Sequence, residues 1–155
     1  MAWIHRISAG VFKGADMERN SDLATQVQRM YDIFNTGDIS AVDDFLSIDE
    51  NVLGVGTDPR EWWAGTDAFR AAWNTQPAEM HAAGLRFKPG DVQAFTEGSM
   101  GWFADQPTLN MPDGGAVPMR MTGVFHEENG AWKMVQFHLS IGALNEELLG
   151  EELTV

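Results

Sequence analysis

Two stretches of alternating apolar and polar residues, joined by Asn129-Gly130, limit the possible folds of this chain more than any other sequence feature. The stretches cover residues 116–127 and 131–141, and a period of two is typical of β-strands. Asn-Gly favours a tight type I′ turn, because such a turn needs positive φ at both central positions and Asn and Gly adopt positive φ most readily. Such a turn pairs Glu128 with Ala131 and fixes the register of the pairs that follow. We therefore expect a long antiparallel hairpin.

The expected register places two different sets of side chains on the two faces of this hairpin. The first face mixes soft apolar groups with a few polar ones: Met119, Met121, Gly123 and Phe125 opposite Ser140, His138, Gln136 and Met134, with Trp132 near the turn. That mixture is typical of a small-molecule pocket. The second face is more aliphatic and suits a core or a contact between two copies: Arg120, Thr122 and Val124 opposite Leu139, Phe137 and Val135. A three-residue loop would exchange the two faces.

Ahead of the strands, the sequence predicts a long amphipathic helix. Ser21 or Asp22 can cap its start, and Gly37 supplies the left-handed residue that commonly ends a helix. Its apolar positions recur at helical spacing and form one stripe: Leu23, Val27, Met30, Tyr31 and Phe34.

Two shorter helices are expected next. Asp38 can cap the first of them, which continues to about Leu46. Thr66 can cap the second, which should end near Gln76 because Pro77 disfavours helical geometry in the residue before it. Between the two helices, the run "NVLGVGTDP" predicts a short strand that ends in a turn at Asp58-Pro59.

Residues beyond 84 alternate with period two and predict strands at about 85–96, 98–109, 116–127 and 131–141. Pro89-Gly90 interrupts the first of them with a bulge or bend. Helices first and strands afterwards favour an α+β domain, in which a curved antiparallel sheet wraps around three N-terminal helices. The 155 residues fit one domain, and the chain contains no internal repeat or linker-like stretch.

Charge and composition exclude several function classes. The net charge of −13 disfavours binding to nucleic acid or to an anionic membrane, because both need clustered Lys and Arg. With no cysteine, the chain has no disulfide and no thiolate metal ligand. It has no apolar run long enough to cross a bilayer, and its first residues do not resemble a secretory leader. We therefore expect a cytoplasmic protein whose partner is neither nucleic acid nor a membrane.

The four histidines do not predict a metal site. None has the i, i+4 spacing of a helical zinc pair. The expected register also puts His126 and His138 on opposite faces of the hairpin. His5 and His81 lie outside the predicted helices and strands. We expect neither a metal nor any other cofactor.

Three short motifs carry a resemblance to a known family: Asn35-Thr36-Gly37-Asp38, Gly65-Thr66-Asp67, and the run from Asn129-Gly130-Ala131-Trp132 to His138-x-Ser140. In this order over residues 21–143, they resemble the SnoaL-like branch of the nuclear transport factor two-like superfamily. The resemblance implies a cone-shaped α+β barrel with one open mouth that holds a pocket, and homodimers built across the sheet. It divides a single domain, 1–155, into an N-terminal extension (1–20), the cone (21–143) and an acidic tail (144–155).

The superfamily includes isomerases, dehydratases, polyketide cyclases and members without catalysis, so individual residues must distinguish among them. Ketosteroid isomerases have a tyrosine on the first helix where this chain has Met30, one position before Tyr31. Their base is an aspartate on the strand after the second helix, where ungapped matching gives Gly54 or Val55. Only a shift of a few residues brings Asp58 to that position, so both differences disfavour steroid isomerisation.

The final motif also resembles the association domain of calcium/calmodulin-dependent kinases. The arginines that line the pocket of that domain are replaced here, with Ala104 and Gly123 near their positions. The resemblance therefore does not imply an anionic ligand.

His138, Asp58 and Tyr31 are the candidate catalytic residues. His138 could act as a general base, because imidazole titrates near neutral pH, or it could simply hydrogen-bond a neighbour inside the cone. Asp58 could have a raised pKa between Trp62 and Trp63, or it could bond its own turn. Tyr31 lies on the apolar stripe of its helix and could position a ligand or only pack in the core.

The expected ligand-binding residues are aromatic, sulfur-containing or small and polar: Trp62, Trp63, Trp102, Met119, Met121, Trp132, Met134, Gln136 and Ser140. Because Trp62 and Trp63 are adjacent, one ring should fill the core while the other lies at the mouth. Such walls suit a small, mostly apolar organic molecule. Three functions remain open: acid–base catalysis of isomerisation, dehydration or cyclisation; a non-catalytic ligand-sensing or oligomerisation module; and a subunit that holds another protein on its aliphatic sheet face.

Overall fold

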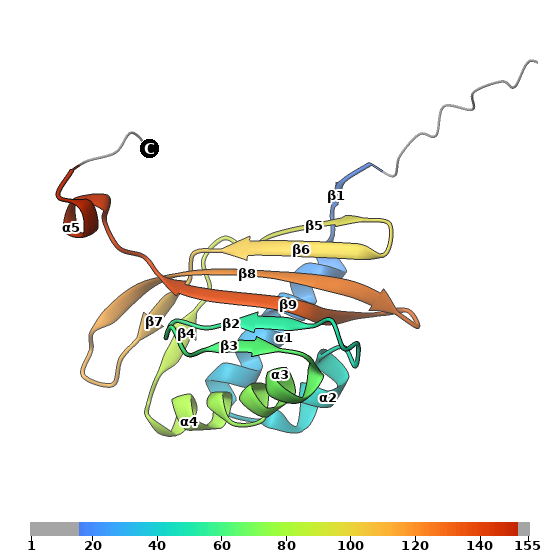
Figure 1. Cartoon of the computed structure of the whole chain (residues 1–155), viewed down its shortest axis with the longest axis horizontal. Helices are drawn as coiled ribbons and strands as arrows, with labels where there is room; N and C mark the ends of the chain where they lie inside the picture. Colours follow the sequence, from blue (N-terminus) through green and yellow to red (C-terminus); the bar gives the residue numbers. More distant parts are fainter. Residues whose placement is uncertain (1–15, 152–155) are drawn as a thin grey trace, which may run out of the picture.

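Helices cover one face of a curved sheet (Figure 1). The computed structural model of the protein describes residues 16–151. Its helices are α1 (Ser21–Thr36), the 3₁₀ turn η1 (Ile39–Ala41), α2 (Val42–Phe45), α3 (Thr66–Trp73), α4 (Gln76–Ala82) and α5 (Asn145–Leu149). Its strands are β1 (Glu18–Arg19), β2 (Leu53–Val55), β3 (Trp62–Ala64), β4 (Arg86–Lys88), β5 (Gln93–Glu97), β6 (Met100–Asp105), β7 (Thr108–Asn110), β8 (Ala116–Glu128) and β9 (Ala131–Ile141). The expected α+β class is confirmed.

The described strands form one nine-stranded sheet, whose main path runs β1-β5-β6-β8-β9-β2-β3. A side arm, in which β4 pairs with β7, joins this path at β8. Neighbouring strands are antiparallel, except that β2 runs parallel to β9. This pair corrects the expectation of a wholly antiparallel sheet. The chain between β2 and β9 is long enough for the crossover that parallel strands need.

Helix α1 has the predicted buried stripe: Leu23, Val27, Met30, Tyr31, Ile33 and Phe34. Its cap lies one residue earlier than expected, because the side chain of Asn20 accepts a hydrogen bond from the backbone amide of Leu23 at 2.8 Å. Gly37 ends the helix in the left-handed conformation, as predicted, with a φ of 69°. Neither α1 nor any other helix within residues 16–151 is long and apolar enough to cross a membrane.

The segment between β2 and β4 contains two elements that the sequence did not predict. Strand β3 turns back along β2, and α4 follows α3 after a short break. Helix α3 ends at Trp73 rather than near Gln76, and Pro77 lies in the first turn of α4. Proline is tolerated there, because the first amide groups of a helix have no partner within it. Pro77 therefore begins a helix instead of ending one, and four α-helices rather than three lie between residue 16 and β4.

The turn between β8 and β9 is as predicted. Asn129 and Gly130 have φ values of 53° and 79°, which are the positive values that a type I′ turn needs. Glu128 pairs with Ala131, so the hairpin starts in the expected register.

A β-bulge then changes the register of this hairpin. Phe125 still pairs with Met134, but the next pair is Val124 with Gln136. Val135 is therefore an extra residue in β9, with no partner of its own in β8. Beyond it, every side chain of β9 points to the face opposite to the expected one, because successive strand residues alternate between faces.

The main core lies where the helices meet the inner face of the sheet, which is the face toward α1–α4. Phe34 and Trp73 pack with ring centroids 5.1 Å apart, and Trp73 packs against Phe137 of β9 at 5.4 Å. Phe45 of α2 meets Phe125 of β8 edge to face at 5.7 Å. These ring contacts join three helices to the central hairpin.

The two ends of the chain lie outside this core. Residues 1–15, which include most of the predicted N-terminal extension and His5, lie outside the described residues, and so do residues 152–155 of the acidic tail. Strand β1 adds a short edge to β5. Helix α5 stands apart from the rest of the fold in Figure 1, and Leu144, Leu148 and Leu149 are exposed.

Replacing Gly54 by Ala should destabilise the fold by about 1–3 kcal/mol, because the added methyl group has no room. A Cβ atom at Gly54 would lie 2.7 Å from the ring of Phe69 and 2.8 Å from that of Trp63. Urea unfolding followed by tryptophan fluorescence measures the change. Gly142→Ala is the matched control, since a Cβ there meets no atom closer than 3.5 Å. Equal stabilities of the two variants would contradict this packing argument.

Candidate functional site

A cavity of about 310 Å³ opens where α4 and the β2–β3 hairpin meet the inner face of the sheet. We call it the mouth cavity. Most of its walls are apolar side chains, among them Phe34, Trp63, Met80, Met119, Phe137 and Leu139. Its polar groups are Thr57, Glu61, Gln76 and Glu79. A mostly apolar hollow with a few placed polar groups is the usual form of a small-molecule site.

Glu61 is the most firmly positioned polar group of this cavity. One carboxylate oxygen accepts a hydrogen bond from the backbone amide of Asp58 at 3.0 Å. The other accepts from the side-chain amide of Gln76 at 2.8 Å. Each carboxylate oxygen can accept two hydrogen bonds, so both keep acceptor capacity for a ligand.

The position of Glu61 depends on Gly56. The backbone amide of Gly56 donates to the Glu61 carbonyl at 2.9 Å, which closes the turn that leads into β3. A Cβ atom on Gly56 would lie 2.1 Å from a carboxylate oxygen of Glu61. The carboxylate therefore lies directly against this backbone, where only glycine leaves room.

Glu79 comes from the first turn of α4, and its side chain is more exposed than that of Glu61. The ion pairs found among residues 16–151 are Arg60–Asp58, Arg70–Asp43 and His126–Glu128. Neither carboxylate of the mouth cavity takes part in them.

Tyr31, one of the predicted catalytic residues, is fully buried in the core. Its hydroxyl donates to Asp105 at 2.5 Å, and Asp105 also accepts from the backbone amides of Gly90 and Gln106 at 3.1 and 2.8 Å. Burial, followed by the hydrogen bond to Asp105 and its negative charge, raises the pKa of Tyr31 well above its ordinary value. Tyr31 does not line the mouth cavity, and its hydroxyl ties α1 to β6.

His138 lies on the outer face of the sheet, away from the helices. It pairs with Thr122 and is exposed. The prediction that its imidazole points into the cone is wrong, because the bulge at Val135 turns it to the other side. The same shift puts His126 and His138 on one face instead of two, though their partners Lys133 and Thr122 lie at separate positions along the hairpin. Residues 16–151 contain no group of three or more potential metal ligands.

Asp58 faces solvent at the turn before β3. Its carboxylate accepts hydrogen bonds from the backbone amide of Arg60 and from Nε of the Arg60 guanidinium, both at 2.8 Å. These hydrogen bonds from the Arg60 side chain and backbone hold the pKa of Asp58 well below its usual range. Of the two alternatives that the sequence left open for Asp58, the structure therefore agrees with a carboxylate that bonds its own turn and not with one of raised pKa.

The predicted ligand-binding residues are divided among three places. Trp63 and Met119 line the mouth cavity, while Met121 and Met134 are buried in the core and Trp132 packs against it. The others lie on the outer face, contrary to the expectation: Trp62, Trp102, Gln136 and Ser140. The bulge explains Gln136 and Ser140. Directly paired strand residues lie on the same face of a sheet. Trp102 pairs with Val124, whose other partner is Gln136, and Trp62 pairs with Val55, whose other partner is His138, so both tryptophans lie on the outer face.

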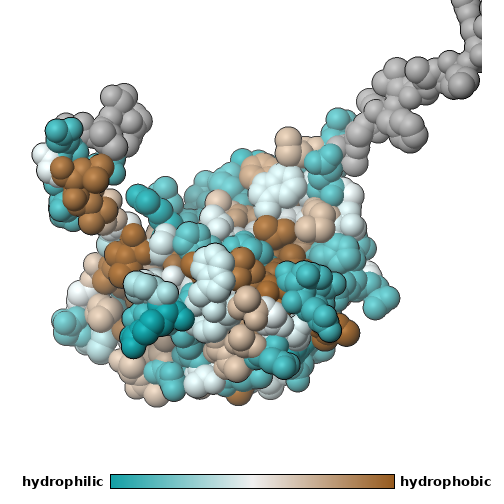
Figure 2. All heavy atoms as spheres, viewed as in Figure 1, coloured by the Kyte–Doolittle hydropathy of each residue, from teal (hydrophilic) through white to brown (hydrophobic). Residues whose placement is uncertain are grey.

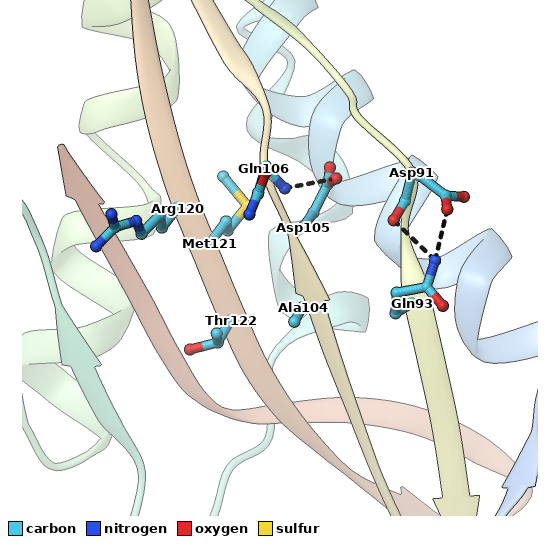
Figure 3. Close-up of a pocket in the computed structure, with 8 residues that line it drawn as sticks. All are labelled: Asp91, Gln93, Ala104, Asp105, Gln106, Arg120, Met121 and Thr122. Carbon is cyan, nitrogen blue, oxygen red and sulfur yellow. Dashed lines mark hydrogen bonds between the residues drawn. The ribbon is translucent and has the colours of Figure 1, made fainter. Parts of the chain in front are cut away.

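Two larger hollows are wider open than the mouth cavity. One, of about 420 Å³, lies on the outer face, where Figure 3 shows Arg120 and Thr122 across from Asp91 and Gln93. The other, of about 680 Å³, lies between the β7–β8 region and the tail. Neither reaches the aromatic core. The mouth cavity does, through Phe34 and Phe137, and it is therefore the candidate site.

Glu61 is the residue that the sequence analysis missed. A signal for it was present, because Glu61 precedes Trp63 by two positions and residues two apart on a strand share a face. Using that signal required a strand at 62–64, and the sequence there predicted only a turn at Asp58-Pro59.

Comparisons with known proteins agree on the fold. The model of the SnoaL-like domain family matches residues 23–143. A nuclear transport factor two-like protein of unknown function from Pseudomonas putida superposes with a TM-score of 0.69 at 16% identity, over 86% of this chain and 92% of that one. No curated protein sequence matches the chain.

Two further crystal structures carry functional names. A candidate dehydratase from Streptomyces avermitilis has a TM-score of 0.65 at 16% identity, over 79% of this chain and 94% of its own. A candidate ketosteroid isomerase from Shewanella frigidimarina has a TM-score of 0.64 at 15% identity, over 78% and 96%. At such low identity these structures support the fold alone.

Alkaline titration tests the buried state of Tyr31, which is the single tyrosine of the chain. Phenolate absorbance should not rise near pH 10, which is the ordinary pKa of a tyrosine, and should appear only as the protein unfolds. Because the raised pKa keeps the proton on the folded state, this contribution to stability is intact below pH 10 and is lost above it, at about 1.4 kcal/mol per pH unit.

Tyr31→Phe is the control, since it removes that alkaline slope. A phenolate signal near pH 10 in the folded protein would contradict the burial of this hydroxyl.

Proposed function

Because the chain belongs to the SnoaL-like family, we propose that it binds a small, mostly apolar organic molecule in the mouth cavity and that Glu61 is the group that exchanges a proton with it. The observation that carries the proposal is a carboxylate held in place at the edge of an aromatic-walled hollow. The earlier candidates lack this position, since Asp58 is bonded to Arg60, Tyr31 to Asp105, and His138 lies on the outer face.

Glu61 suits the role of a general base. Its carboxylate can take a proton from a carbon atom beside a carbonyl group and return it to a neighbouring atom. Such a step belongs to isomerisation, dehydration or cyclisation. The names of the dehydratase and isomerase structures describe those proteins, and they are compatible with this class of chemistry here.

Gln76 supports the same step from the opposite side of the carboxylate. Its amide carries two N–H groups, and one of them donates to Glu61. The second can donate to a ligand oxygen that gains negative charge when Glu61 removes a proton. Gln76 and Glu61 would thus act on adjacent atoms of one ligand.

The outer face of the sheet supports a second proposal, a homodimer. Trp62 is 64% exposed there, and Trp102 stacks on Phe95 with ring centroids 6.1 Å apart. Seen from the side shown in Figure 2, hydrophobic patches are interspersed with pale and hydrophilic residues over the strands. The helices leave this face uncovered, and mixed aromatic and polar surfaces of this kind are typical of protein interfaces.

The catalytic proposal is tested with nitrobenzisoxazole, a small aromatic probe of general bases. A base removes its ring C–H proton, the N–O bond breaks and a coloured cyanophenolate is released. We expect Glu61→Gln to reduce the rate by about 100-fold, which is the usual contribution of a positioned base. Asp58→Asn and His138→Gln should retain the rate, since both residues lie outside the cavity.

Leu139→Trp should abolish probe turnover by filling the cavity, whereas Ile141→Trp, on the exposed end of the same strand, should not. Circular dichroism checks that both variants fold, and Leu109→Trp is a second cavity-filling variant at the rim. Turnover that survives Glu61→Gln would overturn the role of Glu61. Probe binding without any turnover would identify a non-catalytic ligand-binding module instead.

The dimer proposal is tested by analytical ultracentrifugation. Thr122 is exposed near the middle of the outer face, so Thr122→Glu would place new negative charges in an interface between two copies. We expect the dissociation constant of the dimer to rise by about 10-fold or more. Thr25→Glu, on the exposed side of α1, is the matched control. A monomeric wild-type protein, or a heterologous partner on this face, would contradict the homodimer.

A further inference from the structure

The two charged residues that line the mouth cavity are both negative. Its lining includes Glu61 and Glu79 and contains no lysine, arginine or histidine. Two carboxylates at one largely apolar cavity repel each other, and they also repel any anion that enters. A ligand that brought a positive charge would relieve that repulsion.

Within residues 16–151, no cation forms an ion pair with either carboxylate of the mouth cavity. Arg60 precedes Glu61 in the chain, but its Nε and Nη2 donate to Asp58 at 2.8 and 2.9 Å and its side chain is 89% exposed. Arg86 donates to the backbone carbonyls of His81 and Leu85. The two hydrogen-bond donors of the Glu61 carboxylate are neutral amides, so its negative charge is not balanced by an ion pair.

The apolar walls of the cavity add an independent preference. The rings of Phe34, Trp63 and Phe137 line it, and the faces of aromatic rings attract cations. A positively charged nitrogen could therefore lie between the carboxylates and the rings, while the apolar part of the same molecule fills the remaining space.

We propose that the natural ligand is an organic ammonium compound, with a positively charged nitrogen on an apolar body. The inference rests on the proposed binding role of the mouth cavity and adds the chemical class of what binds there. In this arrangement Glu61 pairs with the nitrogen from the floor of the opening and Glu79 from its rim.

Three probes that share one ring system test this proposal: naphthylmethylammonium, naphthylmethanol and naphthoate. Isothermal titration calorimetry at constant ionic strength should give the ammonium probe an affinity at least about 10-fold above that of the neutral alcohol, with no measurable binding of naphthoate. Glu61→Gln and Glu79→Gln should each reduce the ratio of the ammonium affinity to the alcohol affinity, because each removes one of the two negative charges that line the cavity.

Asp58→Asn is the matched control, because it removes a nearby carboxylate that does not line the cavity. It should keep the preference for the ammonium probe. An equal loss in Asp58→Asn would mean that the preference comes from the overall charge of −13, and the inference would be wrong.

Failure of this inference is distinct from failure of the proposed function. If the alcohol and the ammonium probe bind equally, and Leu139→Trp removes both, the cavity is a binding site without a preference for cations. If none of the three probes binds, or if Leu139→Trp leaves their binding unchanged, the binding role of the mouth cavity is itself overturned.

Discussion

One extra residue in β9, Val135, decides which side chains of the central hairpin meet the helices. After this bulge, Phe137 and Leu139 face inward, and both contribute to the mouth cavity. Without the bulge, those two positions would face outward and His138 would replace them. The ring contacts between Trp73 and Phe137, and hence the packing of α3 on the sheet, depend on the same displacement. This single unpaired residue thus decides which of the following β9 side chains point to the inner face of the sheet and which point to the outer face.

Three carboxylates illustrate how the surroundings of a side chain decide its use. Asp105 is buried and accepts hydrogen bonds from Tyr31 and two backbone amides, so most of its acceptor capacity is used within the fold. Asp58 is paired with Arg60. Glu61 is half-buried like Asp58, but it is held by two neutral donors and borders an apolar hollow. That combination is the basis of the role proposed for Glu61.

The fold and the site follow different constraints. Structures with only 15–16% identity share this architecture, because many apolar sequences can fill a core between helices and a curved sheet. The polar groups of a cavity are not needed for that packing, and one fold can host many functions. The proposals for this chain therefore rest on Glu61, Glu79 and Gln76 rather than on the family fold.

The amino-acid sequence alone determined the elements whose signals are local. The stripe of α1, its end at Gly37 and the turn at Asn129-Gly130 all depend on neighbours within a few residues, and the structure has each of them. Only the tertiary structure decided the bulge at Val135 and the pairing of β2 with β9, because both depend on contacts between segments distant in the sequence. The orientation of His138 away from the mouth cavity follows from the bulge. That of Glu61 follows from Gly56 and from the hydrogen bonds of its carboxylate to the Asp58 amide and Gln76.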